Sequence, residues 1–151
     1  MLSQALGWPD IPPVVLRDGP FGVGSVQLFV EADYEQHYFT LRQRPELAPA
    51  FQRIALFDYI ANNADRKGGH ILLGTEGVVW AIDHGLTFHS EYKLRTVIWE
   101  HAGQPIPPEW LAELAELRAA LTADDSPLRQ ALLQLLSATE MVALRTRLNL
   151  L

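Results

Sequence analysis

Two carboxylates, a lysine and a histidine gather between positions 65 and 83 of the sequence. They are Asp65, Lys67, His70 and Asp83. Such residues suit phosphoryl transfer, in which one carboxylate orients or deprotonates the attacking hydroxyl while another holds a magnesium ion on the phosphates. We expect Asp65 to take the first role and Asp83 the second. Lys67 either stabilises the transferring phosphoryl group or is an exposed, solvated lysine without a catalytic role.

A predicted β-hairpin explains how these side chains would come together. Segments 70–73 and 78–83 have the composition of strands, and the glycine-containing segment 74–77 between them has that of a turn. The polar loop 63–69, which contains Asp65, enters at the end of the hairpin where both strands stop. The two carboxylates and the histidine are therefore expected to converge at that end.

The pairing within this hairpin follows from the length of its turn. A four-residue turn places Leu73 opposite Val78 and His70 opposite Ala81. Asp83 then becomes the diagonal neighbour of His70, at about 7 to 8 Å between Cα atoms. Both side chains could reach one ion, so we predict a metal site made by Asp83 and His70.

Several of these polar residues also have simpler interpretations. Asp65 and Asp83 could cap a helix end and a turn. Arg66 is expected to fix the loop against a carboxylate, and Asp58 to accept hydrogen bonds from Arg66 or from loop amides. Asp83 and His70 together with His84 and His89 would suggest a zinc or iron site, but the chain offers no matched helical pair of ligands.

The remaining pattern is that of an α+β protein with more helix than strand. Segments 14–17 and 25–30 predict a second hairpin, and the polar stretch 31–45 predicts an irregular linker. Segment 46–62 has the apolar spacing of a buried helix. We expect everything after Gly85 to be helical.

The C-terminal part carries clear helix signals. An apolar stripe runs through Trp110, Leu114, Leu117 and Leu121, and is expected to face the core. Ser126 precedes Pro127 as an N-cap, and the segment 137–140, Ser-Ala-Thr-Glu, forms a capping box.

Composition narrows the choice of function. The 151 residues include 48% hydrophobic and 20% charged side chains, no cysteine, and a formal net charge of −6. The absence of cysteine removes disulfides and thiolate chemistry and fits a cytoplasmic protein. The negative charge disfavours nucleic acid as a partner. The sequence contains no apolar run of 18 residues, so it predicts no membrane-spanning helix.

Two segments carry a family resemblance. Segment 63–72, Asn-Ala-Asp-Arg-Lys-Gly-Gly-His-Ile-Leu, and segment 80–85, Trp-Ala-Ile-Asp-His-Gly, resemble the catalytic loop (D-R-H-x-x-N) and metal motif (I-D-F-G) of phosphatidylinositol 3-/4-kinase-like and other atypical kinases. Segments 16–20 and 93–99 are similar to small bacterial proteins related to phosphatidylinositol 3-/4-kinases. The resemblance covers most of the chain.

This resemblance implies ATP and Mg²⁺ as ligands and a nucleotide plus a hydroxyl-bearing acceptor as partners. Asp65 matches the catalytic aspartate and Asp83 the metal aspartate. His70 stands where the family pattern has asparagine, and Lys67 where it has histidine. An imidazole prefers transition metals to magnesium, so His70 tunes the site or leaves it with one metal. The adenine-binding hinge matches Leu28, Phe29, Val30 and Glu31.

The resemblance also implies a fold and a domain division. Residues 1–31 match a remnant of the N-terminal lobe with the hinge, and residues 32–151 a mainly helical kinase-like C-terminal lobe. A kinase needs a lysine upstream of the hinge to hold the phosphates. The only lysines are Lys67 and Lys93. We therefore expect this sequence to lack most of an N-terminal lobe.

The leading prediction is therefore an ATP-dependent phosphotransferase that is incomplete in this chain. The sequence lacks a basic patch for phosphoinositide head groups, so it gives no support for a lipid acceptor. One alternative is a non-catalytic kinase-like module that binds a partner. Another is a metal-dependent hydrolase that uses Asp65, His70 and Asp83. The apolar hairpin within residues 14–30 is also expected to promote self-association, because it leaves a strand edge uncovered.

Overall fold

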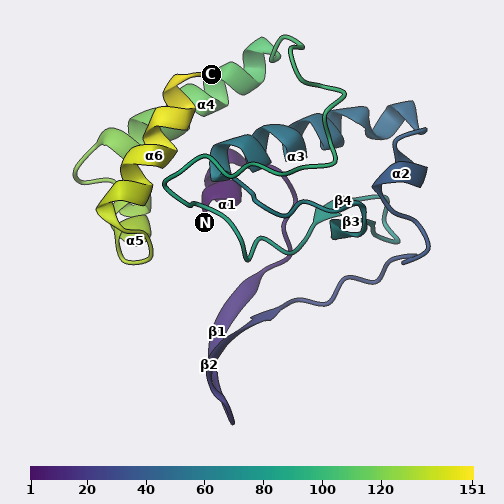
Figure 1. Ribbon diagram of the computed structural model, residues 1–151, viewed down its shortest axis with the longest axis horizontal. Coiled ribbons are helices and arrows are strands. Elements are labelled where there is room, and N and C mark those ends of the chain that lie inside the picture. Colours follow the sequence, from purple (N-terminus) through teal and green to yellow (C-terminus); the bar gives the residue numbers. More distant parts are fainter.

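The computed structural model describes residues 1–151 and combines six α-helices with two separate two-stranded sheets (Figure 1). The α+β class predicted from the sequence is confirmed. The elements in chain order are α1 (Leu2–Leu6), β1 (Val14–Gly19), β2 (Gly22–Gln27), α2 (Tyr38–Leu41), the 3-10 turn η1 (Pro45–Leu47), α3 (Ala48–Ala61), the 3-10 turn η2 (Gly68–His70), β3 (Ile71–Leu73), β4 (Val79–Ala81), α4 (Pro108–Thr122), α5 (Pro127–Leu133) and α6 (Ala138–Asn149).

Helix α3 is the centre of the fold, because its apolar side chains contribute to two hydrophobic clusters. Phe57 and Ile60 belong to a cluster of fourteen buried residues shared with α1, α4, α5 and α6. Phe51 and Ile54, nearer the start of α3, belong to a second cluster of nine shared with α2 and the β3–β4 hairpin. The helix predicted at 46–62 is thus confirmed, and it links the helical part to the small sheet.

The C-terminal helix signals are also confirmed. The stripe from Trp110 to Leu121 is buried in the larger cluster. The Ser126 side chain accepts a hydrogen bond from the backbone N–H of Arg129. Ser137 and Glu140 form the predicted capping box at the start of α6. These local signals work because each satisfies backbone N–H groups that the first helical turn leaves free.

Strands β1 and β2 form a hairpin that extends away from the other elements (Figure 1). Their pairing runs from Val14 opposite Gln27 to Gly19 opposite Gly22, so only Pro20 and Phe21 form the turn. This hairpin is tighter than the predicted one, and residues 28–30 lie beyond its second strand. Every residue of both strands is exposed.

Two expectations about irregular and helical segments are wrong. The stretch 31–45 contains α2, whose Tyr38 and Leu41 are fully buried. The chain after Gly85 is not helical at once, since no helix or strand occurs before α4 begins at Pro108. The backbone of residues 86–95 is instead hydrogen-bonded to residues 61–66.

The β3–β4 hairpin differs from the prediction by one position in register. Ile71 pairs with Ala81 and Leu73 with Val79, so five residues, not four, connect the strands. Gly77 adopts a φ of 80° in this connection, a conformation that glycine reaches without strain. His70 lies in η2 rather than in the strand, and its carbonyl accepts a hydrogen bond from the N–H of Ile82.

Residues before the first hairpin join both parts of the fold. Leu2 and Leu6 of α1 are buried in the larger cluster, and the carbonyl of Asp10 accepts a hydrogen bond from the N–H of Ala81 in β4. The division into 1–31 and 32–151 stays a prediction. None of the helices is both long enough and apolar enough to cross a membrane.

Candidate active site

The loop that carries Asp65 begins where Asn62 ends α3 in a left-handed conformation, with a φ of 54°. The Asn62 side chain donates hydrogen bonds to the carbonyls of His89 and Glu91 and accepts one from the N–H of Lys93. Asparagine tolerates this backbone conformation better than most residues. Asn62 is a functional residue missing from the sequence predictions, although an asparagine after the last apolar residue of a helix is a known termination signal.

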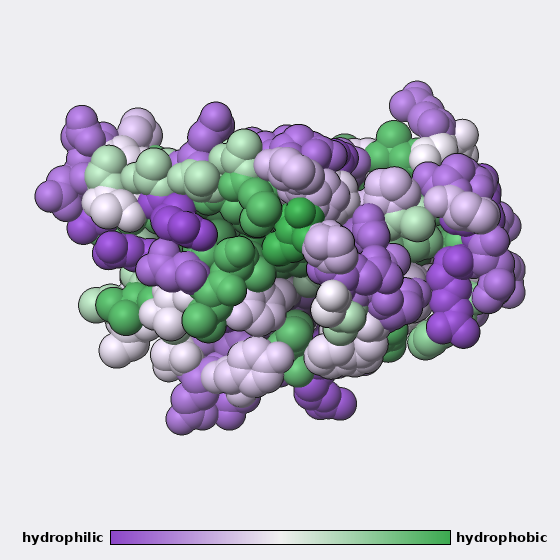
Figure 2. All heavy atoms as spheres, turned by 90° about the horizontal axis from the view of Figure 1, so that it is seen from above, coloured by the Kyte–Doolittle hydropathy of each residue, from purple (hydrophilic) through white to green (hydrophobic).

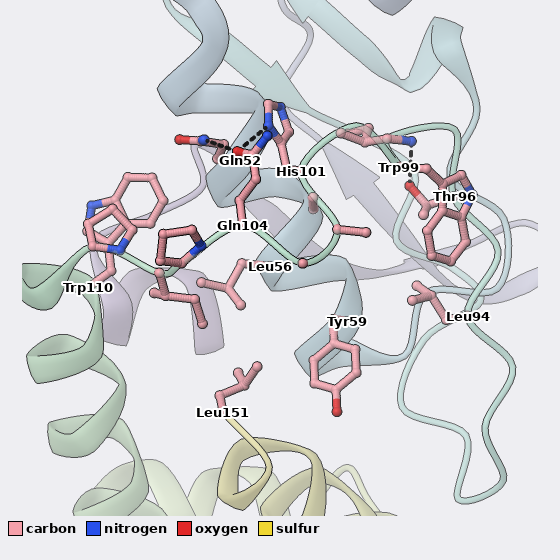
Figure 3. Close-up of a pocket in the computed structure, with 17 residues that line it drawn as sticks. Gln52, Leu56, Tyr59, Leu94, Thr96, Trp99, His101, Gln104, Trp110 and Leu151 are labelled. Atoms are coloured by element: carbon pink, nitrogen blue, oxygen red, sulfur yellow. Dashed lines mark hydrogen bonds between the residues drawn. The ribbon is translucent and has the colours of Figure 1, made fainter.

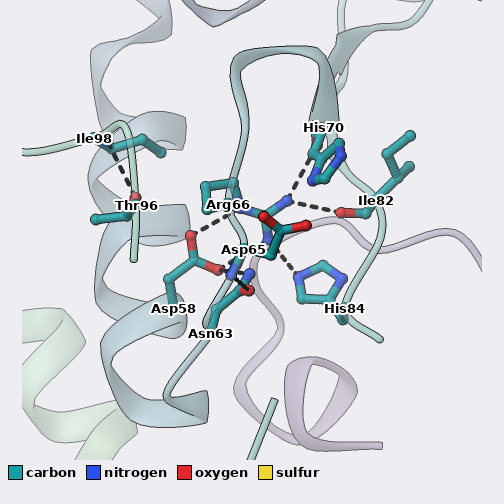
Figure 4. A network of polar contacts seen from close by, with 9 residues as sticks. All are labelled: Asp58, Asn63, Asp65, Arg66, His70, Ile82, His84, Thr96 and Ile98. Carbon is teal, nitrogen blue, oxygen red and sulfur yellow. Dashed lines mark hydrogen bonds and ion pairs between the residues drawn. The ribbon is translucent and has the colours of Figure 1, made fainter. Parts of the chain in front are cut away.

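A buried ion pair holds the loop to α3 (Figure 4). The Arg66 guanidinium donates two hydrogen bonds to the Asp58 carboxylate, Nε to Oδ2 at 2.8 Å and one Nη to Oδ1 at 2.9 Å. Both side chains are fully buried. Asn63 also donates from Nδ2 to Asp58 Oδ1, at 2.9 Å. The structural roles predicted for Arg66 and Asp58 are confirmed.

The same guanidinium connects the loop to both strands of the β3–β4 hairpin at its open end. Its second Nη donates to the carbonyls of His70, at 3.2 Å, and Ile82, at 2.7 Å. These two carbonyls immediately precede β3 and Asp83. Arg66 therefore fixes the Asp65 loop relative to Asp83 despite the difference in register from the predicted pairing.

A second set of contacts fixes the loop from its other side. The backbone N–H of Arg66 donates to the carbonyl of Arg95, and the N–H of Arg95 donates to the carbonyl of Asn63. Asn63 Oδ1 accepts the N–H of Asp65, at 3.0 Å. The backbone around Asp65 is thus bonded on both sides, while its carboxylate remains partly exposed, at 30%.

The Asp65 carboxylate and the Lys67 ammonium form an ion pair at 2.7 Å. The hydrogen bond from Lys67 holds the pKa of Asp65 below its ordinary value, with smaller contributions in the same direction from the charges of His70 and Arg95. Asp65 is therefore anionic at neutral pH. An anionic carboxylate can accept a hydrogen bond from an acceptor hydroxyl and so orient it.

His70 and Asp83 are brought together, with His70 Nε2 at 3.3 Å from Asp83 Oδ2. The histidine side chain is mostly buried, whereas 56% of the Asp83 side chain is exposed. Asp83 has a φ of 56°, so the chain leaves β4 sharply and turns this carboxylate outward. One exposed carboxylate suits a Mg²⁺ ion that takes its remaining ligands from water and phosphates.

No group of three or more metal-ligating side chains occurs in the structure. The donor set offered by Asp83 and His70 therefore fits one magnesium ion held with a nucleotide better than a metal cage made by the protein alone. It does not supply the four protein ligands of a structural zinc site.

His84 adds an uncharged ring to the network. Its Nε2 lies 2.7 Å from an Arg66 Nη. A guanidinium can only donate hydrogen bonds, so the histidine nitrogen accepts and the ring proton lies on Nδ1. Burial lowers the pKa of His84 to about 3, with the charges of Arg66 and His70 acting in the same direction.

Gly68 is required by packing against Phe39 rather than by access for a ligand. A Cβ at this position would lie 2.9 Å from a ring carbon of Phe39, whereas one at Gly69 would meet nothing within 4 Å. Of these two glycines, only Gly69 leaves open space through which a ligand could approach the backbone closely.

The segment matched to an adenine-binding hinge is extended and close to β3–β4. The Glu31 carbonyl accepts from the N–H of Thr75, at 3.3 Å. The N–H of Leu28 donates to Pro13, and the Val30 carbonyl accepts from the Tyr34 hydroxyl. The backbone groups of Phe29 have no partner within the chain, which leaves them available to a base.

Comparison with known proteins relates the chain to a kinase family. The family model described as phosphatidylinositol 3- and 4-kinase matches residues 17–140, a span that includes all four proposed catalytic and metal-binding residues. Protein Rv2133c of Mycobacterium tuberculosis is 38% identical over 180 residues, covering 97% of this chain and 64% of its own length. Phosphatidylinositol 4-kinase gamma 4 of Oryza sativa subsp. japonica is 31% identical over 126 residues, covering 75% of this chain and 22% of its own.

The chain belongs to the phosphatidylinositol 3- and 4-kinase family. It therefore carries a domain of the kinase type, in a family that generally uses ATP and Mg²⁺. The chain spans less than two thirds of the length of either relative.

Proposed function

We propose that this chain supplies the metal-binding and acceptor-orienting half of an ATP-dependent phosphotransferase. Asp65 accepts a hydrogen bond from the acceptor hydroxyl, and Lys67 stabilises charge on the transferring group. Asp83 and His70 hold one Mg²⁺, which when bound would neutralise charge on the phosphate oxygens. Backbone groups within segment 28–31 contact the adenine base.

The observation that carries this proposal is the hydrogen bonding of Arg66. Its guanidinium joins Asp58 in α3 to the carbonyls of His70 and Ile82. Asp65 precedes Arg66 and Asp83 follows Ile82, so one buried cation sets the relative positions of the two functional carboxylates. Preorganised charges of this kind need no rearrangement when substrate binds.

The non-catalytic module remains a second candidate, because the sequence has no lysine before residue 67. A kinase-type site needs such a cation on the phosphates, and without it nucleotide affinity falls. In this candidate the Arg66 network only stabilises the loop, and the chain contributes a binding surface to a partner.

The metal-dependent hydrolase is less well supported. It would require Asp65, His70 and Asp83 to share one ion, and no three metal-ligating side chains form such a group. The Asp65 carboxylate is instead engaged by Lys67.

The test compares binding of MgATP by the unaltered chain, Asp83→Asn and the control Asp125→Asn. Asparagine retains the left-handed backbone at 83 but removes the anionic ligand. Asp125 is exposed and forms no ion pair. With a millimolar Kd, MgATP at ten times the Kd stabilises the native state by about 1.4 kcal/mol, or a rise in Tm of roughly 3 °C.

We expect this rise in the unaltered chain and in Asp125→Asn but not in Asp83→Asn. Circular dichroism checks that all three are folded. An equal rise in all three would remove Asp83 from the site. The absence of any rise and of any calorimetric heat in the unaltered chain would favour the non-catalytic module.

A further inference from the structure

A cavity of about 260 Å³ lies between α3, residues 94–107 and the start of α4. Figure 2 shows a broad apolar area hollowed into the upper face of the molecule, and Figure 3 shows side chains from these three segments converging on the cavity. None of Asp65, Lys67, His70 and Asp83 lines it. It is therefore separate from the candidate active site.

The lining of the cavity has no charged side chain. Ten of its seventeen residues are hydrophobic, and none is Asp, Glu, Lys or Arg, although charged residues make up 20% of the chain. Tyr59, Trp99 and Trp110 supply aromatic rings to its wall. A charged ligand would lose part of its hydration here without gaining an acidic, lysine or arginine side chain as a partner, so the lining favours neutral molecules.

Three polar side chains of the lining, Gln52, His101 and Gln104, lie together on one side of the cavity, opposite Tyr59 (Figure 3). Gln104 Oε1 accepts a hydrogen bond from Gln52 Nε2 at 3.0 Å and lies 3.3 Å from His101 Nδ1. Gln104 Nε2 donates to the Glu100 carbonyl. The amide oxygen of Gln52 is left without a partner within the chain, as is the hydroxyl of Tyr59. A ligand with a single O–H or N–H group could use either as an acceptor.

We propose that this cavity binds a neutral, planar molecule of about two fused rings that carries one hydrogen-bond donor. A dry cavity of about 150 Å³ is large enough for benzene, so the larger volume here suits two rings. Flat rings match the aromatic wall, because offset stacking and edge contacts add to the gain from burial. Phosphorylated ligands are disfavoured, which distinguishes this cavity from the nucleotide site.

The cavity also adjoins the backbone that supports Asp65. Leu94 and Thr96 line it, and between them Arg95 is hydrogen-bonded to the carbonyl of Asn63 and the N–H of Arg66. Occupancy should therefore slow hydrogen exchange of the amides of Arg66 and Arg95, because a bound molecule opposes opening of segment 94–96.

The probe is 2-naphthol, which is neutral at pH 7, and its matched control is 2-naphthalenesulfonate, which has the same rings and a negative charge. For an eleven-atom ligand we expect a Kd of about 0.1 to 1 mM for 2-naphthol, measured by calorimetry. The sulfonate should bind at least about tenfold more weakly.

Variants then locate the binding. Ala55→Trp places an indole in the cavity from α3 and should abolish binding, while Ala115→Trp on the exposed face of α4 should leave it unchanged. Trp99→Ala removes a half-exposed wall residue, with 54% exposure, and should weaken binding about three- to tenfold without unfolding the chain. It serves as the test if Ala55→Trp does not fold.

We expect saturable binding of 2-naphthol that is lost in Ala55→Trp or weakened in Trp99→Ala. Hydrogen exchange of the Arg66 and Arg95 amides should become slower. The proposal is overturned if 2-naphthol does not saturate, if the sulfonate binds equally well, or if the folded cavity variants bind 2-naphthol like Ala115→Trp.

Discussion

The Asp65 loop and the β1–β2 hairpin are both short segments, but the chain holds them in opposite ways. In the loop, buried charged and polar side chains are paired on several sides, with Arg66 alone contacting Asp58, His70 and Ile82. In the hairpin, backbone hydrogen bonds pair the strands while apolar side chains such as Val23 and Val26 remain more than half exposed.

This difference shows what determines position in each segment. A buried ion that loses one partner is costly, so the loop has few alternative arrangements. A lone two-stranded sheet is only marginally stable in water and gains from any surface that covers it. The proposed nucleotide site combines loop residues with segment 28–31, which directly follows the hairpin. The loop half of this site is held by buried contacts, whereas no other element covers the half next to the hairpin.

Removing the central cation should have the largest effect on stability. Arg66→Met leaves the buried Asp58 carboxylate without an ionic partner and with the Asn63 side chain as its remaining side-chain donor. We expect a loss of about 3 to 5 kcal/mol in the free energy of unfolding, measured in urea. Arg17→Met on the exposed β1 strand is the matched control and should change stability by less than about 0.5 kcal/mol. Equal losses of stability at the two positions would mean that the buried contacts of Arg66 do not fix the loop more strongly than an exposed side chain does.

A smaller effect should appear when the pH is lowered. The pKa of His84 is about 3 in the folded chain and near 6.5 when the chain is unfolded. Below pH 6.5 the unfolded state therefore binds a proton that the native state does not, so stability falls as pH decreases towards 3. The loss attributable to this group has a limiting slope of about 1.4 kcal/mol per pH unit.

The variant His84→Gln isolates this contribution, since glutamine can still accept a hydrogen bond from Arg66 but does not titrate. Urea unfolding of both proteins between pH 7 and 4 should show a steeper decline for the unaltered chain. Parallel curves would show that His84 is not held neutral by its surroundings.

The hairpin should affect association more than stability. Val15 and Val26 are directly paired and both about half exposed. We expect the unaltered chain to form dimers or larger species in light scattering, through the uncovered hairpin. Changing the pair to Val15→Glu and Val26→Lys should give a monomer, with a stability change within about 0.5 kcal/mol. A monomeric unaltered chain at high concentration would show that the hairpin needs no partner.

The sequence predicts features that depend on local signals or on the cost of burying charge. The caps of α5 and α6 follow from single residues, Ser126 and Ser137. Asp58 lies within an apolar helix, and a buried carboxylate requires a donor, so its contact with Arg66 could be anticipated. The meeting of His70 with Asp83 was also predicted, because both lie at the end of one hairpin.

Other features depend on tertiary partners that leave no periodic signal. A five-residue connection with Gly77 in a left-handed conformation changes the register of β3–β4, and the sequence does not distinguish it from a four-residue turn. The four-residue helix α2 is too short to show periodicity. Between Gly85 and α4, backbone groups of His89, Glu91 and Lys93 are hydrogen-bonded to the Asn62 side chain rather than within a helix.

Binding of manganous ATP, followed by NMR, tests the central claim most directly. Mn²⁺ replaces Mg²⁺ and broadens the signals of nuclei near the metal. We expect selective broadening at Asp65, His70 and Asp83, weaker broadening at Phe29, and none at Gln104 in the apolar cavity. The effect should be lost in Asp83→Asn but not in Asp125→Asn. Broadening that is absent at Asp83, or that survives unchanged in Asp83→Asn, would contradict the placement of a metal–nucleotide site at the end of the β3–β4 hairpin.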